Sequence, residues 1–112
     1  KELSIIERFY ASQFATFLSK LKETRDSDGN PLLDSTAVLF GSGMGNASSH
    51  SSRNLPVLLA GGGFKHGNHH RFERHNRDGR ALGDLFVSIL QQFGIEQDQF
   101  SNNGSNLNHL LT

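Results

Sequence analysis

Apolar residues recur every three or four positions along the first part of the chain. The main stripe consists of Leu3, Ile6, Tyr10, Phe14, Phe17 and Leu21, and Ile5, Phe9 and Leu18 widen it. This spacing is typical of an amphipathic α-helix, and it predicts a helix over residues 1–25. So wide an apolar face needs a large partner surface. We therefore expect that the chain does not fold alone, and that the rest of a longer chain or a partner subunit covers the face of residues 3–21.

Two short apolar runs follow a predicted turn at residues 26–31, where the sequence reads DSDGNP. The first run covers residues 36–40 (TAVLF), and the second covers residues 55–60 (LPVLLA). Neither run alternates polar with apolar residues. This pattern predicts strands that are buried on both faces, as in a parallel sheet covered by helices.

A second amphipathic helix is predicted near the C-terminal end. Its apolar positions are Leu82, Leu85, Phe86, Ile89, Leu90 and Phe93. Gly94 stands where a glycine commonly ends a helix, and Asp78 is a candidate N-cap. The order helix, strand, loop, strand, long loop, helix indicates an α/β fold. We expect residues 1–98 to form the C-terminal portion of a single α/β domain and residues 99–112 to form a polar C-terminal tail.

Composition narrows the classes of function. The 112 residues suit one domain, and 11 basic and 11 acidic residues give a net charge of zero. A neutral chain has little electrostatic attraction for a phosphate backbone, so we expect no nucleic-acid partner. The absence of cysteine excludes disulfides, thiolate metal ligands and a cysteine nucleophile. No apolar run approaches the roughly 20 residues of a membrane-spanning helix.

The segment between the predicted strands contains a single histidine among small residues. It reads GSGMGNASSHSSRN from Gly41 to Asn54. Loops at the carboxyl ends of buried strands often bind ligands, and small residues let the backbone approach a ligand closely. The candidate ligand residues are Ser42, Gly43, Asn46, His50 and Arg53. His50 suits a divalent metal or acid–base catalysis, and the alternative is that it only holds the shape of the loop.

A second histidine-rich segment, HGNHHRFERH, covers residues 66–75. His69 and His70 are adjacent, so at most one of them faces a given metal, and His66 or His75 would have to join it. Glu73 is the carboxylate within this segment. Arg53 and Arg71 are candidates for binding an anion. The spacing matches no compact zinc motif, and the alternative is a solvated surface loop.

Two resemblances follow from the order of motifs LLDSTAVLFGSGMG, His50, NLPVLLAGGG and LGDLFVSILQQFGI. Residues 30–95 resemble the C-terminal part of a family of uncharacterised secreted proteins common in planctomycetes. Proteins of that family are several times longer and usually begin with an export signal. More distantly, residues 55–63 and 82–95 are similar to the C-terminal half of the alkaline phosphatase and sulfatase superfamily.

These resemblances imply a layered sheet with flanking helices, of which this chain holds the C-terminal portion, and a periplasmic or secreted location. They imply metal-assisted hydrolysis of a phosphate or sulfate ester, with zinc, calcium or manganese as the divalent metal. His50 would be one ligand, and His69 or His70 another. The superfamily places an Asp and a His after the first strand, whereas GSGMG contains no carboxylate. A non-catalytic binding or structural protein that retains the fold is therefore the alternative.

Overall fold

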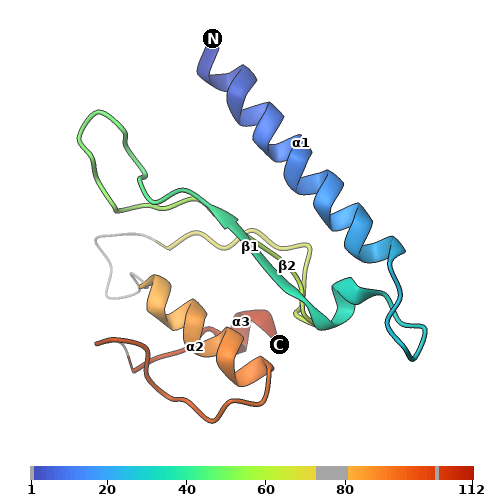
Figure 1. Ribbon diagram of the computed structural model, residues 1–112. Coiled ribbons are helices and arrows are strands. Elements are labelled where there is room, and N and C mark those ends of the chain that lie inside the picture. The colour runs from blue at the N-terminus through green and yellow to red at the C-terminus, as the bar shows by residue number, and fades with distance from the viewer. Residues whose placement is uncertain (1, 73–80, 103) are drawn as a thin grey trace. The chain divides into compact units, whose positions relative to one another are not determined.

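The computed structural model describes residues 2–72, 81–102 and 104–112 (Figure 1). The elements in chain order are α1 (Glu2–Glu23), the 3-10 helix η1 (Leu32–Ser35), β1 (Ala37–Gly41), β2 (Val57–Gly61), α2 (Leu82–Gln92) and α3 (Asn108–Leu111). The chain divides into two compact units, unit 1 (residues 1–62) and unit 2 (residues 63–112). The prediction of mixed α and β structure is confirmed.

The first helix forms where the apolar period predicts it. Helix α1 carries the acidic Glu2 in its first turn and the basic Lys20 and Lys22 in its last turn. These charges oppose the partial charges of the helix ends and stabilise the helix. None of the residues described for α1 is buried. The apolar face of α1 is therefore only partly covered by the residues that the structure describes.

The predicted turn after α1 is confirmed, and Asp26 organises it. The carboxylate Oδ1 of Asp26 accepts hydrogen bonds from the backbone N–H groups of Asp28 at 2.9 Å and Asn30 at 2.8 Å. Gly29 adopts a φ of 86°, which a glycine tolerates without steric cost. The N–H of Leu32 then donates to the carbonyl of Thr24 at 2.9 Å. These bonds return the chain from α1 to η1.

The two strands pair antiparallel, so the predicted parallel arrangement is wrong for this pair. The register runs from Ala37 opposite Gly61 to Gly41 opposite Val57. A parallel pair needs a crossover connection of a dozen or more residues, usually a helix. Residues 42–56 form no helix and instead return the chain beside β1. The pattern of apolar residues carries no information on strand direction, because both arrangements suit short apolar runs.

The strands are half-buried, so the prediction of strands buried on both faces is also wrong. Leu39 and Leu58 remain 40% and 54% exposed. On one face, the ring of Phe14 from α1 stacks on the ring of Phe40, with centroids 4.9 Å apart and planes 17° apart. Figure 1 shows α1 running along the β1–β2 hairpin within unit 1. Unit 1 thus consists of α1, η1 and a two-stranded sheet, and the Phe14–Phe40 stack joins α1 to β1.

Unit 2 contains the buried core of the described chain. Val87 and Ser88 of α2 are fully buried, and the other buried apolar side chains are Phe64, Leu85 and Leu107. The predicted stop at Gly94 is confirmed. Gly94 has a φ of 78°, its N–H donates to the carbonyl of Gln91, and the N–H of Ile95 donates to that of Leu90. This pair of bonds is the Schellman arrangement that ends many helices.

The N-terminal end of α2 lies next to residues that the structure does not describe. Asp78, the candidate N-cap, is outside the described residues, and the N-cap position is occupied by Ala81. Asp84 in the first turn is 5% exposed. A carboxylate in the first turn of a helix interacts favourably with the unpaired N–H groups there. The negative charge of Asp84 therefore stabilises the N-terminal end of α2.

The C-terminal residues pack onto α2 and onto the start of unit 2. The buried N–H of Leu107 donates to the hydroxyl of Ser88 at 2.7 Å, and the N–H of Lys65 donates to the carbonyl of Leu111 at 2.7 Å. The ring of Phe100 contacts the ring of Phe86, with centroids 4.9 Å apart. Across the described ranges, the helices are too short or too polar for any one of them to span a membrane.

Candidate functional site

The candidate ligand loop, residues 42–56, joins β1 to β2. It is named here the strand-end loop. Its backbone is closed by its own hydrogen bonds. The N–H of Gly45 donates to the carbonyl of Ser51 at 2.8 Å, and the N–H of Ser51 donates to the carbonyl of Asn46 at 3.1 Å. A side chain at Gly45 would collide with the carbonyl oxygens of Arg53 and Asn54. Glycine therefore allows the two arms of the loop to lie close together.

Two of the predicted site residues use their side chains within the loop. The Oδ1 atom of Asn46 accepts hydrogen bonds from the N–H groups of Ser48 at 3.0 Å and Ser49 at 3.1 Å. The hydroxyl of Ser42 donates to the carbonyl of Met44 at 2.9 Å. Such bonds from Asn and Ser side chains to nearby backbone are common in turns. In this structure Ser42 and Asn46 shape the backbone of the loop.

Unlike Ser42 and Asn46, His50 and Arg53 do not use their side chains to bond to the backbone of the loop. Both residues are exposed. His50 adopts the left-handed region with a φ of 50°, and the backbone N–H of Arg53 donates to the hydroxyl of Ser51 at 3.3 Å. The imidazole and the guanidinium make no hydrogen bond or ion pair with any residue that the structure describes. Gly43 lies in open space, so its backbone is also accessible.

The strand-end loop thus offers two nitrogen-rich side chains from a hydrogen-bonded backbone. A guanidinium binds oxyanions through paired N–H donors, and an imidazole can donate, accept or bind a metal. No carboxylate lies between Gly41 and Gly63 to compete for these groups. The chemistry of the loop therefore suits a negatively charged ligand.

The second candidate segment belongs to unit 2 and follows a buried anchor. Phe64 is buried, and the next residue, Lys65, bonds to Leu111 as described above. His69 and His70 are exposed, and neither side chain makes a hydrogen bond or ion pair within the described chain. His75 and Glu73 lie outside the described residues.

In the part of the chain that the structure describes, the side chains do not assemble a metal centre. Over residues 2–72, 81–102 and 104–112, no three His, Cys, Asp or Glu residues gather closely enough to hold a metal ion. His50 belongs to unit 1, whereas His69 and His70 belong to unit 2. A structural or catalytic zinc needs three or four protein ligands. A metal role for these three histidines accordingly stays a prediction.

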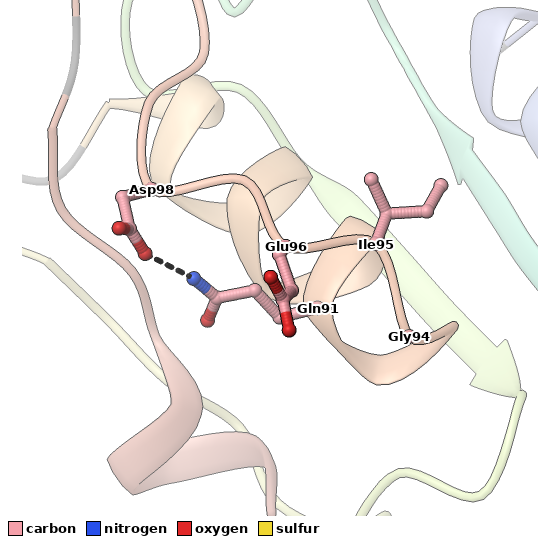
Figure 2. A pocket seen from close by; sticks show the side chains of 5 residues that line it. All are labelled: Gln91, Gly94, Ile95, Glu96 and Asp98. Carbon is pink, nitrogen blue, oxygen red and sulfur yellow. Dashed lines mark hydrogen bonds between the residues drawn. The ribbon is translucent and has the colours of Figure 1, made fainter.

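Gln91 is a structural residue that the sequence analysis does not single out. Its amide Nε2 donates to the carbonyl of Gln97 at 2.9 Å and to Oδ1 of Asp98 at 3.1 Å, and its Oε1 accepts from Nδ2 of Asn108 at 2.7 Å. Figure 2 shows the Gln91 and Asp98 side chains turned toward each other. One amide thus connects α2 with two later segments of the chain.

A pocket of about 470 Å³ lies beside this amide. It is lined by Gln91, Gly94, Ile95, Glu96 and Asp98, and Figure 2 shows these residues around the C-terminal end of α2. Because Gln91 and Asp98 already bond to each other, the pocket retains few free polar groups at fixed positions. The sequence does contain a signal that could have pointed to Gln91. Its spacing from Asp84 and Ser88 places three polar residues on one side of an otherwise apolar helix.

A scan of protein-family models, a search of curated proteins and a search of solved structures each gave no match to this chain.

Proposed function

We propose that the strand-end loop binds the oxyanion of a phosphate or sulfate ester, as part of an exported protein of alkaline phosphatase and sulfatase type. In this proposal the protein is a periplasmic or secreted binding protein. One observation carries it: His50 and Arg53 are exposed on a loop that is held by its own hydrogen bonds, and neither side chain has a partner among the described residues. The resemblance of residues 55–63 and 82–95 to that superfamily supports the choice of anion.

The roles of the two side chains follow from their chemistry. The guanidinium of Arg53 supplies a fixed fork of donors for two oxyanion oxygens. The imidazole of His50 supplies a further donor. Ser42 and Asn46 hold the backbone that carries them. Gly43 leaves room for a ligand to approach the main chain.

A second candidate function is metal-assisted hydrolysis of the same class of ester. It rests on the resemblance, with His50 and one of His69 or His70 as ligands of zinc, calcium or manganese. The described residues do not supply a complete ligand set. No catalytic step is therefore assigned to a metal. This candidate requires further ligands, and metal content separates it from the first.

An NMR titration of the 112-residue chain with inorganic phosphate and sulfate tests the binding proposal. We expect shifts of the backbone amides of the strand-end loop that saturate, and we expect Arg53→Ala to abolish them. Arg8→Ala removes a guanidinium from the exposed surface of α1 and is the matched control. Sodium chloride at equal ionic strength controls for screening. Equal titrations of both variants would show that the loop is not the anion site.

Elemental analysis of the protein from its natural source tests the hydrolase candidate. A stoichiometric divalent metal that is lost in His50→Ala supports metal-assisted hydrolysis. Protein without metal, with no rise in melting temperature on adding zinc, calcium or manganese, contradicts it. Anion binding by the loop can be measured whether or not the protein contains a metal. Each of the two candidate functions can therefore be contradicted without the other.

A further inference from the structure

An apolar surface on α1 stays exposed in the described structure. It is named here the α1 stripe and consists of Leu3, Ile6, Tyr10 and Phe17, which are 66%, 48%, 56% and 49% exposed. Their spacing of three, four and seven residues places them on one face of the helix. Contiguous apolar surface of this kind on a folded protein marks an interaction site.

The α1 stripe adjoins the surface through which α1 contacts β1 within unit 1. Phe14 lies at the edge of the same face, and its ring stacks on Phe40 of β1 at a centroid distance of 4.9 Å. Leu18 and Leu21 are half-buried, whereas the residues of α1 before Phe14 are all exposed. The packed part of the face therefore passes without interruption into the exposed part.

The charges beside the α1 stripe select one direction of pairing. Glu2 and Lys20 are separated by eighteen positions, about five full turns of an α-helix, so they flank the stripe on the same side. In an antiparallel pair of identical helices, residues on the same flank face each other across the interface. Glu2 would then lie opposite Lys20 of the second copy, and this pair would occur twice. In a parallel pair the same flanks lie on opposite sides of the interface, so Glu2 and Lys20 of the two copies would not meet.

We propose that α1 pairs antiparallel with α1 of a second copy of this chain, through the α1 stripe. The two-fold axis passes near residue 11, so Tyr10 packs at the centre and Ile6 packs beside Phe17 of the second copy. The interface is isologous, as in most homodimers, because the same surface is used on both chains. This proposal is independent of anion binding by the strand-end loop.

Sedimentation of the full 112-residue chain over a wide range of protein concentrations tests the proposal. We expect a reversible species of twice the 12.4 kDa chain mass. Tyr10→Glu should raise its dissociation constant by on the order of 100-fold, because an unpaired carboxylate would be buried at the centre. Ser19→Glu adds the same charge to the opposite face of α1 and should leave the dissociation constant unchanged. Circular dichroism checks that both variants retain α1.

Charge reversal tests the direction of pairing. It also tests the dimer itself if the Tyr10→Glu variant fails to fold. Glu2→Lys and Lys20→Glu should each weaken the dimer by about two- to tenfold, because two surface ion pairs are lost. The double variant restores opposite charges and should restore the dimer. A monomer at all concentrations, larger irregular aggregates, or a double variant weaker than both single variants would each overturn the proposal. A monomer would assign the α1 stripe to another segment of its own chain or to a different partner.

Discussion

Units 1 and 2 differ in how completely they bury their apolar residues. Helix α1 has 22 residues and α2 has 11. In α1 the large side chains that remain exposed are Leu3, Ile5, Ile6, Phe9, Tyr10 and Phe17. In α2, by contrast, Val87 and Ser88 are fully buried.

Two differences accompany this contrast, because α2 has the more apolar sequence and more segments of the chain converge on it than on α1. Helix α1 packs on a two-stranded hairpin, and such a sheet is marginal as a support. Helix α2 is bonded to residues 97–98 and 107–108. The shorter helix therefore has the denser surroundings.

A buried charge in unit 2 should have the largest effect on stability. We expect Val87→Asp to lower the free energy of unfolding of unit 2 by about 4 kcal/mol or more, because a carboxylate would replace a fully buried side chain. Urea denaturation followed by NMR measures this loss. The matched change in unit 1 is Ile5→Asp at a position that is 67% exposed, where we expect about 0.5 kcal/mol or less. Equal losses at both sites would contradict the comparison.

The end of β2 is closely packed against η1 within unit 1. Gly61 has a φ of 71°, and an added Cβ atom would collide with the carbonyl oxygens of Thr36 and Leu33. We expect Gly61→Ala to cost about 2–3 kcal/mol in thermal or urea unfolding. Gly29→Ala has a similar φ of 86° in open space, so it should cost only about 1 kcal/mol. If both variants lost the same amount, backbone strain alone would explain the effect.

Ser88 tests the polar part of the core of unit 2. Its hydroxyl accepts the buried N–H of Leu107, and Ser88→Ala leaves that N–H without an acceptor. We expect a loss of about 1–3 kcal/mol in the free energy of unfolding and faster hydrogen exchange at the Leu107 amide. Ser19→Ala in the exposed part of α1 is the control, and it should change stability little. Unchanged exchange at Leu107 would show that another group satisfies this N–H.

Asn46 should have the smallest effect on global stability, because the strand-end loop is exposed. Asn46→Ala removes the acceptor for the N–H groups of Ser48 and Ser49. We expect a cost below about 1 kcal/mol, with faster hydrogen exchange at these two amides. Asn46→Asp keeps an acceptor at the same position and should retain slow exchange. If both variants exchanged equally fast, the Asn46 side chain would not organise the loop.

The local elements could be predicted from the sequence, because each depends on a short stretch of chain. The period of the apolar residues gives α1 and α2, the DSDGNP stretch gives the turn around Asp26, and Gly94 gives the end of α2. Strand direction could not be predicted, because an apolar run of five residues suits parallel and antiparallel neighbours equally. The burial of the two strands was overestimated, because an apolar run does not show which other segments cover it.

The candidate site was predictable only in part. The turn-forming roles of Ser42 and Asn46 agree with the known preference of these residue types, and they compete with the ligand roles first assigned to them. The metal roles of His50, His69 and His70 stay predictions, because spacing along a sequence does not fix distances in space. Gln91 was missed because its partners Gln97, Asp98 and Asn108 come from segments without periodic pattern.

The bond from the Lys65 N–H to the Leu111 carbonyl has a consequence for synthesis on the ribosome. Its two ends are separated by most of unit 2, and Leu107 also has to reach Ser88. The hairpin of unit 1 needs only the residues up to Gly61. Unit 1 can therefore assemble while the chain is still growing, whereas unit 2 must wait until its last residues have left the exit tunnel. During that interval the apolar side chains of α2 lack their cover and are open to chaperones.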